Sequence, residues 1–439
     1  MRIGIIGAGI AGMTAAYELA GAGHEVAVYE RGPRVGGLLD TFVIEGAPLE
    51  KFYHHFFSTD ADLIDLVEKL GISDRLKWYP SSIGIYTGGR LYRFSTPRDV
   101  LSFSPMPFVD RVRMGAVLFY LSKVKEWKKF EPWTVEEWMR RFAGRSAYDV
   151  VWGPLLYGKF GEYAPEIGMP WLYARIHTRA NSRSEGMKTE ELGYFKGSVK
   201  VLVDSVQTAI LSRGGKIHTG VSIDRIAVEG GKATGIVVGG ELKPFDAVIA
   251  TTASSILLRL APELGGPYRA LLEGTRYHAA IVAVLKLCCP LSPYYWLNIN
   301  DPTFPFLAVI EHTNYISPSE YGGKRILYLG KYCSPQHPLY AMDDQSLLQT
   351  YYASLRKIFP RFDPAQVEEA HVFRGPNAQP IVTTHYSAKM PSYRTPIRNL
   401  YMANMSQIYP EDRGTNYSIR LGRAVSRMVI DDGKGLTGR

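Results

Sequence analysis

The chain has 439 residues. A single hydrophobic core of ordinary size does not organise so many residues, so we expect two domains. Hydrophobic residues make up 46% of it, and no uninterrupted apolar run is long enough to span a bilayer. This composition is that of a soluble globular protein. The three cysteines, Cys288, Cys289 and Cys333, lack metal-type spacing, which argues against a disulfide framework and a zinc site.

The net charge of +9 favours anionic substrates or an anionic membrane surface as partners. A mildly basic solvated surface explains it equally well. The basic stretch 123–129 has too few aromatic or sequence-reading features for a nucleic-acid module, so no nucleic-acid partner is expected. The first apolar strand begins at Ile3 without a signal-peptide h-region, so we expect a cytoplasmic protein.

A dinucleotide-binding pattern opens the chain. Residues 3–6 are apolar and mostly β-branched, which predicts a buried strand, and residues 13–20 predict a helix. Between them lies the loop Gly7-Ala8-Gly9-Ile10-Ala11-Gly12. Residues 24–29 predict a second strand, which ends at Glu30.

Each position of this pattern has a physical role. Gly7 permits a tight turn, Gly9 lets the backbone approach a pyrophosphate, and Gly12 lets the helix pack closely on the strand. The helix N-terminus offers free N–H groups and the positive end of its dipole to the phosphates. Glu30 lies where a carboxylate meets ribose hydroxyls and disfavours a 2′-phosphate.

The stretch from Glu30 through Gly36-Gly37 to Leu39 resembles the second signature of the amine oxidase and protoporphyrinogen oxidase superfamily of flavoproteins. In that superfamily an acid at the strand end precedes a short loop and a Gly-Gly pair near the flavin pyrophosphate. The resemblance implies FAD as the cofactor. The N-terminal residues expected to bind it are Gly7, Gly9, Ile10, Ala11, Gly12, Glu30, Arg31, Gly36, Gly37 and Leu38.

Two adjacent histidines, His54 and His55, follow at the point where family members enter the substrate cavity. They could bind a polar or anionic substrate and shuttle a proton. If the aromatic segment 51–57 is a strand, only one of them faces the cavity, and a core strand with one satisfied histidine is equally favoured. No third ligand has suitable spacing, so no metal site is expected.

The next elements belong to a second domain. Residues 63–70 predict a helix that ends at Gly71, and residues 83–94 predict a hairpin around Thr87-Gly88-Gly89. Residues 111–129 predict an amphipathic helix with a basic end. Packing within the second domain is favoured for this helix, and peripheral contact with a membrane stays open.

Several cations could bind an anionic group of a substrate. Arg175, His177 and Arg179 alternate along the chain and form a cationic stripe if the backbone is extended. Arginine forks suit a diphosphate or a carboxylate. Further cations of the same kind are Arg374, Arg413 and Arg420.

By the same resemblance, residues 195–202 enter a helix, residues 214–226 form a strand pair, and residues 245–252 return to the sheet. The family pattern places the backbone of Val221 against the adenine. Residues 281–285 and 325–329 predict buried strands, and residues 345–358 predict a helix.

The C-terminal part resembles the strand, loop and helix with which family members close over the flavin. Residues 399–405 are the expected strand, and the helix N-terminus faces the flavin ring. Most family members have Gly-Asp or Gly-Glu where this chain has Asn404-Met405 or nearby residues. The candidates for holding the ribityl chain or the pyrophosphate are therefore Asp412, Thr415 and Asn416.

The expected fold class is α/β, with a Rossmann-type FAD-binding domain and a discontinuous second α+β domain for the substrate. The FAD-binding domain is expected to comprise residues 1–60, 195–270 and 396–439. The substrate-binding domain is expected to comprise residues 61–194 and 271–395.

The predicted function is an FAD-dependent oxidase or dehydrogenase that transfers a hydride from a small-molecule substrate to the flavin. The positive charge suggests an anionic substrate, and oxygen or a quinone is the expected external electron acceptor. The candidate catalytic residues are His54, His55 and Arg413. Two alternatives stay open, a redox-neutral nucleotide-sugar mutase similar to UDP-galactopyranose mutase and a non-enzymatic binding protein of the Rab escort type. The sequence does not indicate an oligomeric state.

Overall fold

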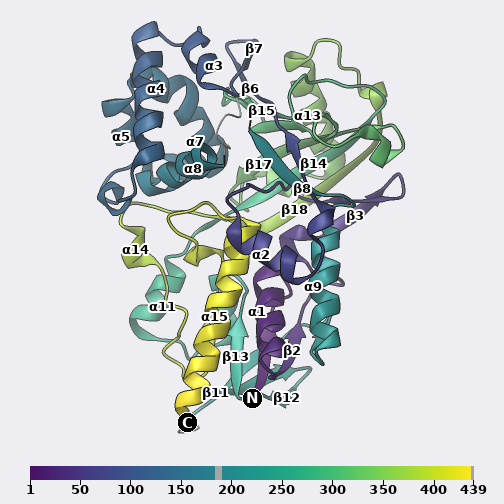
Figure 1. The fold of residues 1–439 in the computed structure, drawn as a ribbon, viewed down its shortest axis with the longest axis vertical. Coiled ribbons are helices and arrows are strands. Elements are labelled where there is room, and N and C mark those ends of the chain that lie inside the picture. The colour runs from purple at the N-terminus through teal and green to yellow at the C-terminus, as the bar shows by residue number, and fades with distance from the viewer. Residues whose placement is uncertain (183–189, 437–439) are drawn as a thin grey trace.

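A five-stranded parallel sheet organises the end of the molecule that carries both termini (Figure 1). The computed structural model describes residues 1–182 and 190–436. The predicted domain segments 61–194 and 396–439 extend over residues 183–189 and 437–439, which lie outside the described residues. In spatial order the strands are β19 (Leu400–Met402), β13 (Ala247–Ala250), β1 (Arg2–Ile6), β2 (Glu25–Tyr29) and β9 (Lys216–His218).

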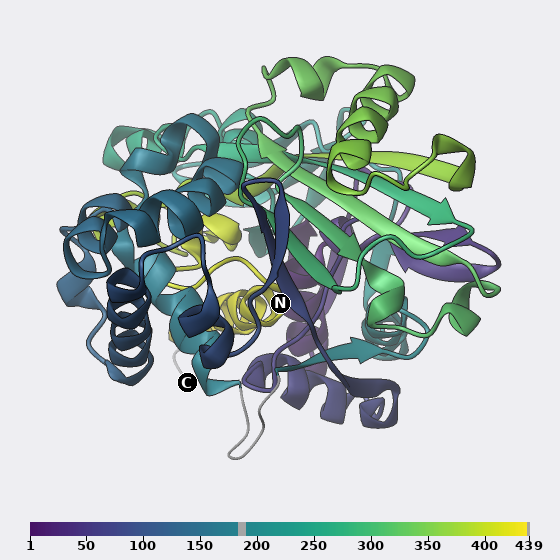
Figure 2. The same cartoon turned by 90° about the horizontal axis from the view of Figure 1, so that it is seen from above.

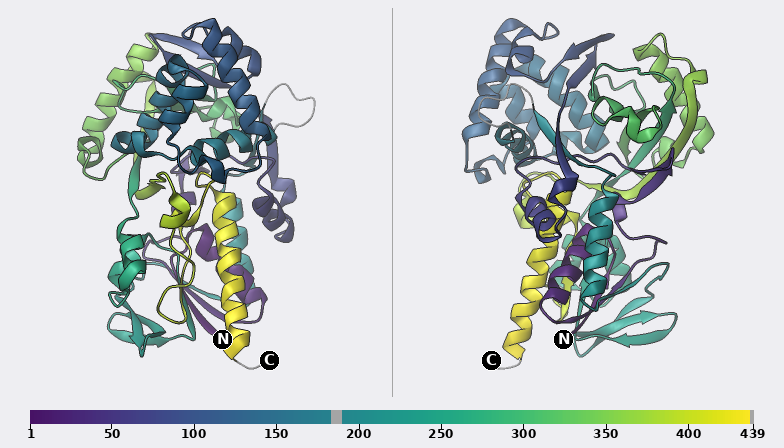
Figure 3. Two further views of the ribbon diagram at one scale, coloured as in Figure 1. Left: turned by 90° about the vertical axis from the view of Figure 1, so that its left-hand side faces the viewer. Right: turned by 45° about the vertical axis from the view of Figure 1, so that its right-hand side comes forward.

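This sheet lies between two layers, because its strands bury apolar side chains on both faces. One face packs against α1 (Ile10–Gly21), α9 (Lys200–Ser212) and α15 (Thr415–Leu436). Figure 3 shows the long α15 running along this body toward the C-terminus. The other face packs against β10 (Arg225–Glu229), β11 (Lys232–Val238), β12 (Glu241–Pro244), α10 (Ser254–Leu260) and α11 (Gly266–Glu273).

A mixed seven-stranded sheet organises the opposite end of the molecule. Its spatial order is β18 (Val367–Pro380), β14 (Tyr277–Leu287), β17 (Arg325–Cys333), β16 (Ala308–Glu311), β15 (Trp296–Ile299), β6 (Ile83–Thr87) and β7 (Arg90–Arg93). Helix α13 (Asp344–Ile358) covers one face with Leu347, Tyr351 and Leu355. The two-stranded pairs β3 (Thr41–Ile44) with β4 (Ala47–Glu50) and β5 (Leu76–Pro80) with β8 (Glu191–Phe195) pack at the other face.

A cluster of helices stands beside this second sheet (Figure 2). Its members are α3 (Pro97–Ser102), α4 (Phe108–Lys123), α5 (Val135–Phe142), α6 (Arg145–Ala147), α7 (Gly153–Phe160) and α8 (Met169–Asn181). The cluster has its own apolar core, which includes Met114, Trp138 and Trp171. Three further helices lie elsewhere in the chain: α2 (Ala61–Lys69), α12 (Pro338–Ala341) and α14 (Tyr386–Lys389).

The predicted α/β class with a Rossmann-type parallel sheet is confirmed. The predicted strands and helices of the first 30 residues correspond to β1, α1 and β2, and the predicted hairpin corresponds to β6 and β7. The turn of that hairpin holds Gly88 and Gly89 at φ of +56° and +75°, a conformation that glycine adopts without strain. The proposed boundaries between the two domains stay a prediction.

Three local expectations were wrong. The helix expected at 111–129 ends at Lys123, where Val124 turns extended and its carbonyl accepts a hydrogen bond from Tyr173 Oη at 2.6 Å. Residues 52–55 form a loop rather than a strand, because only Phe56 pairs with a neighbour, Gly193. Arg175 and Arg179 are helical rather than extended, since both lie on α8.

Candidate active site

One cavity of about 350 Å³ extends from the glycine-rich loop to the second sheet. The N-terminus of α1 borders it, as do the N-terminus of α15 and the side chains of α8. The predicted site residues that line it are Gly9, Ile10, Ala11, Gly36, Leu38, His54, His55, Asp412, Arg413, Thr415 and Asn416. Those that lie behind the lining or beyond it are Gly7, Gly12, Glu30, Arg31, Gly37 and Val221.

The glycines of the first loop have the geometry that a pyrophosphate site needs. Gly7 has a φ of +103°, and a Cβ on Gly12 would lie 2.1 Å from the carbonyl oxygen of Gly7. A Cβ on Gly9 would meet no atom within 4 Å, because it would project into open space beside the cavity. Gly9 is also the N-cap of α1, and no side chain caps the helix there. The end of α1 therefore offers backbone N–H groups to an anion.

The second glycine pair lies directly on the first loop. The N–H of Gly36 donates to the carbonyl of Ala8 at 2.8 Å, and a Cβ on Gly37 would lie 3.1 Å from the Cα of Gly9. Gly36 and Gly37 have φ values of +113° and +61°. The chain can therefore pass this close only with glycine at both positions.

Glu30 organises the same loop. Its Oε2 accepts a hydrogen bond from the N–H of Ala8 at 2.9 Å, and its Oε1 accepts one from the N–H of Gly32 at 2.7 Å. The Val221 N–H donates to the carbonyl of Glu30 at 2.9 Å, and the expected contact of the Val221 backbone with the adenine stays a prediction. The open glycine loop, the uncapped helix end and the half-buried carboxylate together fit the ADP half of FAD.

Substituting Glu30 with alanine is expected to weaken FAD binding by about 1–3 kcal/mol, the scale of hydrogen bonds to a charged group. The fold should survive, because Glu30 lies at a strand end and is partly exposed. Fluorescence titration of the apoprotein with FAD measures the effect. Glu30→Gln is the matched control, since it keeps the hydrogen-bond acceptor and loses the charge. Unchanged affinity in Glu30→Ala would assign the carboxylate another role.

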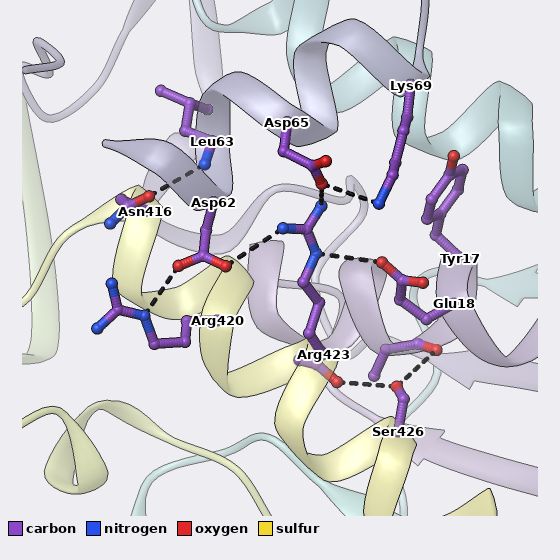
Figure 4. Close-up of polar contacts among 12 residues, drawn as sticks. Tyr17, Glu18, Asp62, Leu63, Asp65, Lys69, Asn416, Arg420, Arg423 and Ser426 are labelled. Atoms are coloured by element: carbon purple, nitrogen blue, oxygen red, sulfur yellow. Dashed lines mark hydrogen bonds and ion pairs between the residues drawn. The ribbon is translucent and has the colours of Figure 1, made fainter. Parts of the chain in front are cut away.

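The other side of the cofactor space is closed by α15. Thr415 and Asn416 begin this helix, and Asn416 Oδ1 accepts a hydrogen bond from the N–H of Leu63 at 3.0 Å. Arg423, only 8% exposed, lies further along the helix and bonds Glu18 and Asp62 at 3.2 Å, and also Asp65 (Figure 4). Carboxylates from α1 and α2 thus hold α15 in place, with its N-terminus toward the cavity.

His54 and His55 both line the cavity, because the segment is not the strand that would have turned one of them away. The loop at 52–55 has no strand alternation, which lets adjacent side chains reach the same space. His54 Nδ1 lies 2.6 Å from the carbonyl of Phe52, and His55 Nδ1 lies 3.1 Å from Tyr295 Oη. Burial lowers the pKa of His54 to about 4 and the pKa of His55 to about 3. Both imidazoles are therefore neutral near pH 7.

A cluster of charged side chains, most of them half-buried, lines part of the same cavity. Asp412 bonds Lys159 of α7 and Arg175 of α8, the latter at 3.1 Å. Arg179 lies four residues after Arg175, so both face the cavity from one side of α8. Arg413 Nε donates to Gln379 Oε1 at 3.0 Å, and its Nη2 bonds Tyr332 Oη.

The charges of this cluster perturb one another. Burial alone would raise the pKa of Asp412, but Lys159, Arg175 and Arg413 outweigh it and hold that pKa well below its ordinary value. Burial lowers the pKa of Lys159 to about 7, against the opposing pull of Asp412. Burial also lowers the pKa of the Arg175 guanidinium. Asp412 is therefore an anion under all ordinary conditions, surrounded by cations.

Of the cations considered from the sequence, some lie outside the cavity lining. His177 points away from the cavity lining and contacts Asn181, while Arg374 bonds Asp344 and Arg420 bonds Asp62. Lys159 is not among the cations expected from the sequence. No local pattern identifies it, since Lys159 and Asp412 lie 253 positions apart. In the described part of the chain, no group of His, Cys, Asp or Glu side chains could hold a metal ion.

This fold and this cavity define an enzyme that binds a dinucleotide between a Rossmann sheet and a second, substrate-side sheet. The model of the family described as flavin containing amine oxidoreductase matches residues 10–425. The chain belongs to this family. It is an FAD-dependent oxidoreductase, as the second glycine signature predicted, and the non-enzymatic alternative is set aside.

Relatives and solved structures agree with this assignment. The chain is 25% identical over 312 residues to a probable zeta-carotene desaturase of Synechococcus elongatus, covering 65% of this chain and 63% of the relative. It is 25% identical over 325 residues to a coproporphyrinogen III oxidase of Mycobacterium leprae, covering 69% and 68%. The match therefore spans a little under two thirds of the desaturase.

Two solved structures share the fold over nearly the whole chain. A putative protoporphyrinogen oxidase from Exiguobacterium sp. 255-15 superposes with a TM-score of 0.78 at 17% identity, covering 98% of this chain and 99% of that one. A reduced UDP-galactopyranose mutase superposes with a TM-score of 0.75 at 18% identity, covering 98% and 95%. At such identities the likeness concerns the fold alone.

Proposed function

We propose that this FAD-dependent oxidoreductase oxidises a small substrate that carries an anionic group. The observation that carries the proposal is the cluster of buried Lys159 and half-buried Arg175, Arg179 and Arg413 on the cavity wall. Asp412 is a single carboxylate among these four cations. Arg179 pairs with a different carboxylate, because Glu190 Oε2 lies 3.5 Å from its guanidinium.

Arg413 is the strongest candidate for the substrate contact. Its guanidinium bonds only neutral groups, Gln379 and Tyr332, and among the described residues no carboxylate oxygen lies within ion-pair distance of it. A buried cation without a direct counterion attracts an anion strongly. Arg175 and Arg179 extend the same surface, so a carboxylate, phosphate or diphosphate fits the charge of this wall.

The two neutral histidines face the same cavity as the cations. The chemistry that FAD supplies when bound is two-electron oxidation of the substrate by hydride transfer. Oxidation of an amine or alcohol carbon also releases a proton, which leaves to solvent, and His54 and His55, both neutral and facing the cavity, orient the substrate through hydrogen bonds. We assign reoxidation to an external acceptor, oxygen or a quinone.

Anaerobic mixing of the FAD-bound protein with candidate substrates tests this function. Anionic substrates should bleach the absorbance of oxidised flavin, and their neutral esters or amides should not. Arg413→Ala should lower the apparent second-order rate of bleaching at least about 100-fold, as expected for a buried charge pair left incomplete. Arg361→Ala, an exposed arginine outside the cavity, is the matched control and should react like the wild type. Bleaching by neutral substrates alone would contradict the proposal.

A redox-neutral mutase acting on a nucleotide sugar is the second candidate. Three arginines on one cavity wall suit a diphosphate, and the fold is shared with UDP-galactopyranose mutase. The two candidates differ in their use of electrons. A mutase is active only after the flavin has been reduced and consumes no reductant during turnover, whereas an oxidoreductase bleaches its flavin once per substrate molecule.

The affinity for an anionic ligand should fall as the pH rises through about 7. Lys159 is charged below its lowered pKa of about 7 and neutral above it, so the cavity loses one positive charge over this range. We expect about a tenfold loss, the scale of one charge-assisted contact. Equilibrium titration with inorganic pyrophosphate at several pH values measures it. Lys159→Met should remove this step from the profile, and a wild-type affinity that stays flat across pH 7 would contradict the prediction.

A further inference from the structure

Helix α4 presents apolar side chains to solvent along one entire face. Its inner face, with Met114 and Leu121, is buried in the core of the helical cluster. Its outer face carries side chains that are 45–68% exposed. These are Phe108, Val109, Val112, Phe119 and Tyr120. The helix is thus apolar on two opposite faces, and its packing within the cluster explains only one of them.

The exposed residues form a continuous stripe. At about 100° per residue they fall within one sector of about 120° around the helix axis. Arg111 and Arg113 lie on the two borders of this sector. Leu101 of the neighbouring α3 is 46% exposed and adds to the same surface. We call this surface the α4 face. In the rest of the described chain, large exposed apolar side chains such as Val43 and Leu211 are scattered singly.

Cations border the stripe and lie over its rings. Arg111 stands over Phe108 at 5.5 Å, Lys123 over Phe119 at 5.9 Å, and Lys129 over Tyr120 at 5.1 Å. Residues 97–130 contain seven Lys or Arg against three Asp or Glu, a net charge of +4. An apolar stripe with a basic border is the pattern of a helix that lies in the interface of an anionic bilayer.

We propose that the α4 face is a docking surface for an anionic phospholipid membrane. The stripe lies on a convex helix, not in a groove, and its basic border complements anionic headgroups. In the described part of the chain no helix is both long and apolar enough to cross a bilayer, so the contact is peripheral. The α4 face lies at the end of the molecule remote from both chain termini (Figure 1). This inference does not depend on the proposed substrate.

Sedimentation of the FAD-bound protein with vesicles tests the proposal. The protein should bind vesicles of equal parts phosphatidylglycerol and phosphatidylcholine, and raised salt or pure phosphatidylcholine should weaken that binding. The double variant Phe108→Ser/Phe119→Ser should bind at least about tenfold more weakly. The matched control Val43→Ser/Leu211→Ser removes apolar groups that are 66% and 50% exposed and lie on β3 and α9, away from the α4 face, and should bind like the wild type.

The charge border is tested separately. Lys123→Glu/Lys125→Glu should weaken binding at least about tenfold, while Lys216→Glu/Lys232→Glu, exposed lysines near the other sheet, should not. Hydrogen exchange on the unmodified protein needs no variant, and residues 108–123 should become protected when vesicles are added. The proposal is overturned if the wild type ignores anionic vesicles. It is also overturned if the control variants lose as much binding, or if light scattering shows that the α4 face mediates self-association in place of lipid binding.

Discussion

Asp412→Asn is expected to lower the free energy of unfolding by about 3–5 kcal/mol, the cost of breaking a buried ion pair. The carboxylate is 17% exposed and pairs with Lys159 and Arg175, and the backbone N–H of Arg413 donates to it at 3.1 Å. The asparagine amide fills the same volume without the charge, so Lys159 and Arg175 lose their counterion. Urea unfolding of the FAD-bound protein, followed by tryptophan fluorescence, measures the loss.

The control for this variant is Asp344→Asn. Asp344 pairs with Arg374, but its side chain is 57% exposed, so its loss should cost no more than about 1 kcal/mol. A further experiment adds an anion to the variant and to the wild type. Pyrophosphate should restore more stability to Asp412→Asn than to the wild type, because it supplies the missing negative charge. An Asp412→Asn protein as stable as the wild type would show that the cluster does not depend on its carboxylate.

Gly12→Ala is expected to weaken FAD binding at least about 100-fold and to lower the melting temperature of the apoprotein. The new Cβ would lie 2.1 Å from the Gly7 carbonyl oxygen and 2.9 Å from Thr251 Oγ1, so α1 must move away from the sheet. Such overpacking costs about 1–3 kcal/mol and also displaces the helix end that faces the phosphates. FAD titration and thermal unfolding measure the two effects separately.

Two other glycine variants separate the effect on FAD binding from the effect on the stability of the apoprotein. Gly9→Ala has an unstrained φ of −70° and open space around its Cβ, so the apoprotein should melt like the wild type while FAD binding weakens. Gly115→Ala lies on α4, also has open space, and should change neither quantity. If Gly12→Ala binds FAD normally, the close packing of α1 on the first loop is not what shapes the cofactor site.

The cofactor half of the site could be predicted from the sequence because its determinants are local. The strand, the glycine loop and Glu30 lie within 30 consecutive residues, and each glycine satisfies a constraint set by its immediate neighbours. The second pair, Gly36 and Gly37, lies only a few residues further on and packs on the first loop. Such short-range geometry leaves a fixed spacing in the sequence.

The substrate half could be predicted only in part, because it is assembled from distant segments. The positive cluster joins α7, α8 and the loop before α15, and no spacing relates Lys159 to Asp412. The loop at His54 and His55 also departs from its apparent strand pattern, since the His55 ring packs against Tyr295 and Trp296, which come much later in the chain. Tertiary packing determines both the charge cluster and the loop conformation at His54 and His55.

Titration of the flavin absorbance spectrum with ligands tests the anionic substrate site most directly. At low salt, inorganic pyrophosphate or a simple carboxylate should perturb the spectrum of the FAD-bound protein, and the effect should weaken as salt rises. Arg413→Ala or His55→Ala should weaken the perturbation while FAD stays bound. If neutral amines or apolar isoprenoids perturb the spectrum and anions do not, the cavity is not an anion site and its cations serve only to balance buried charge.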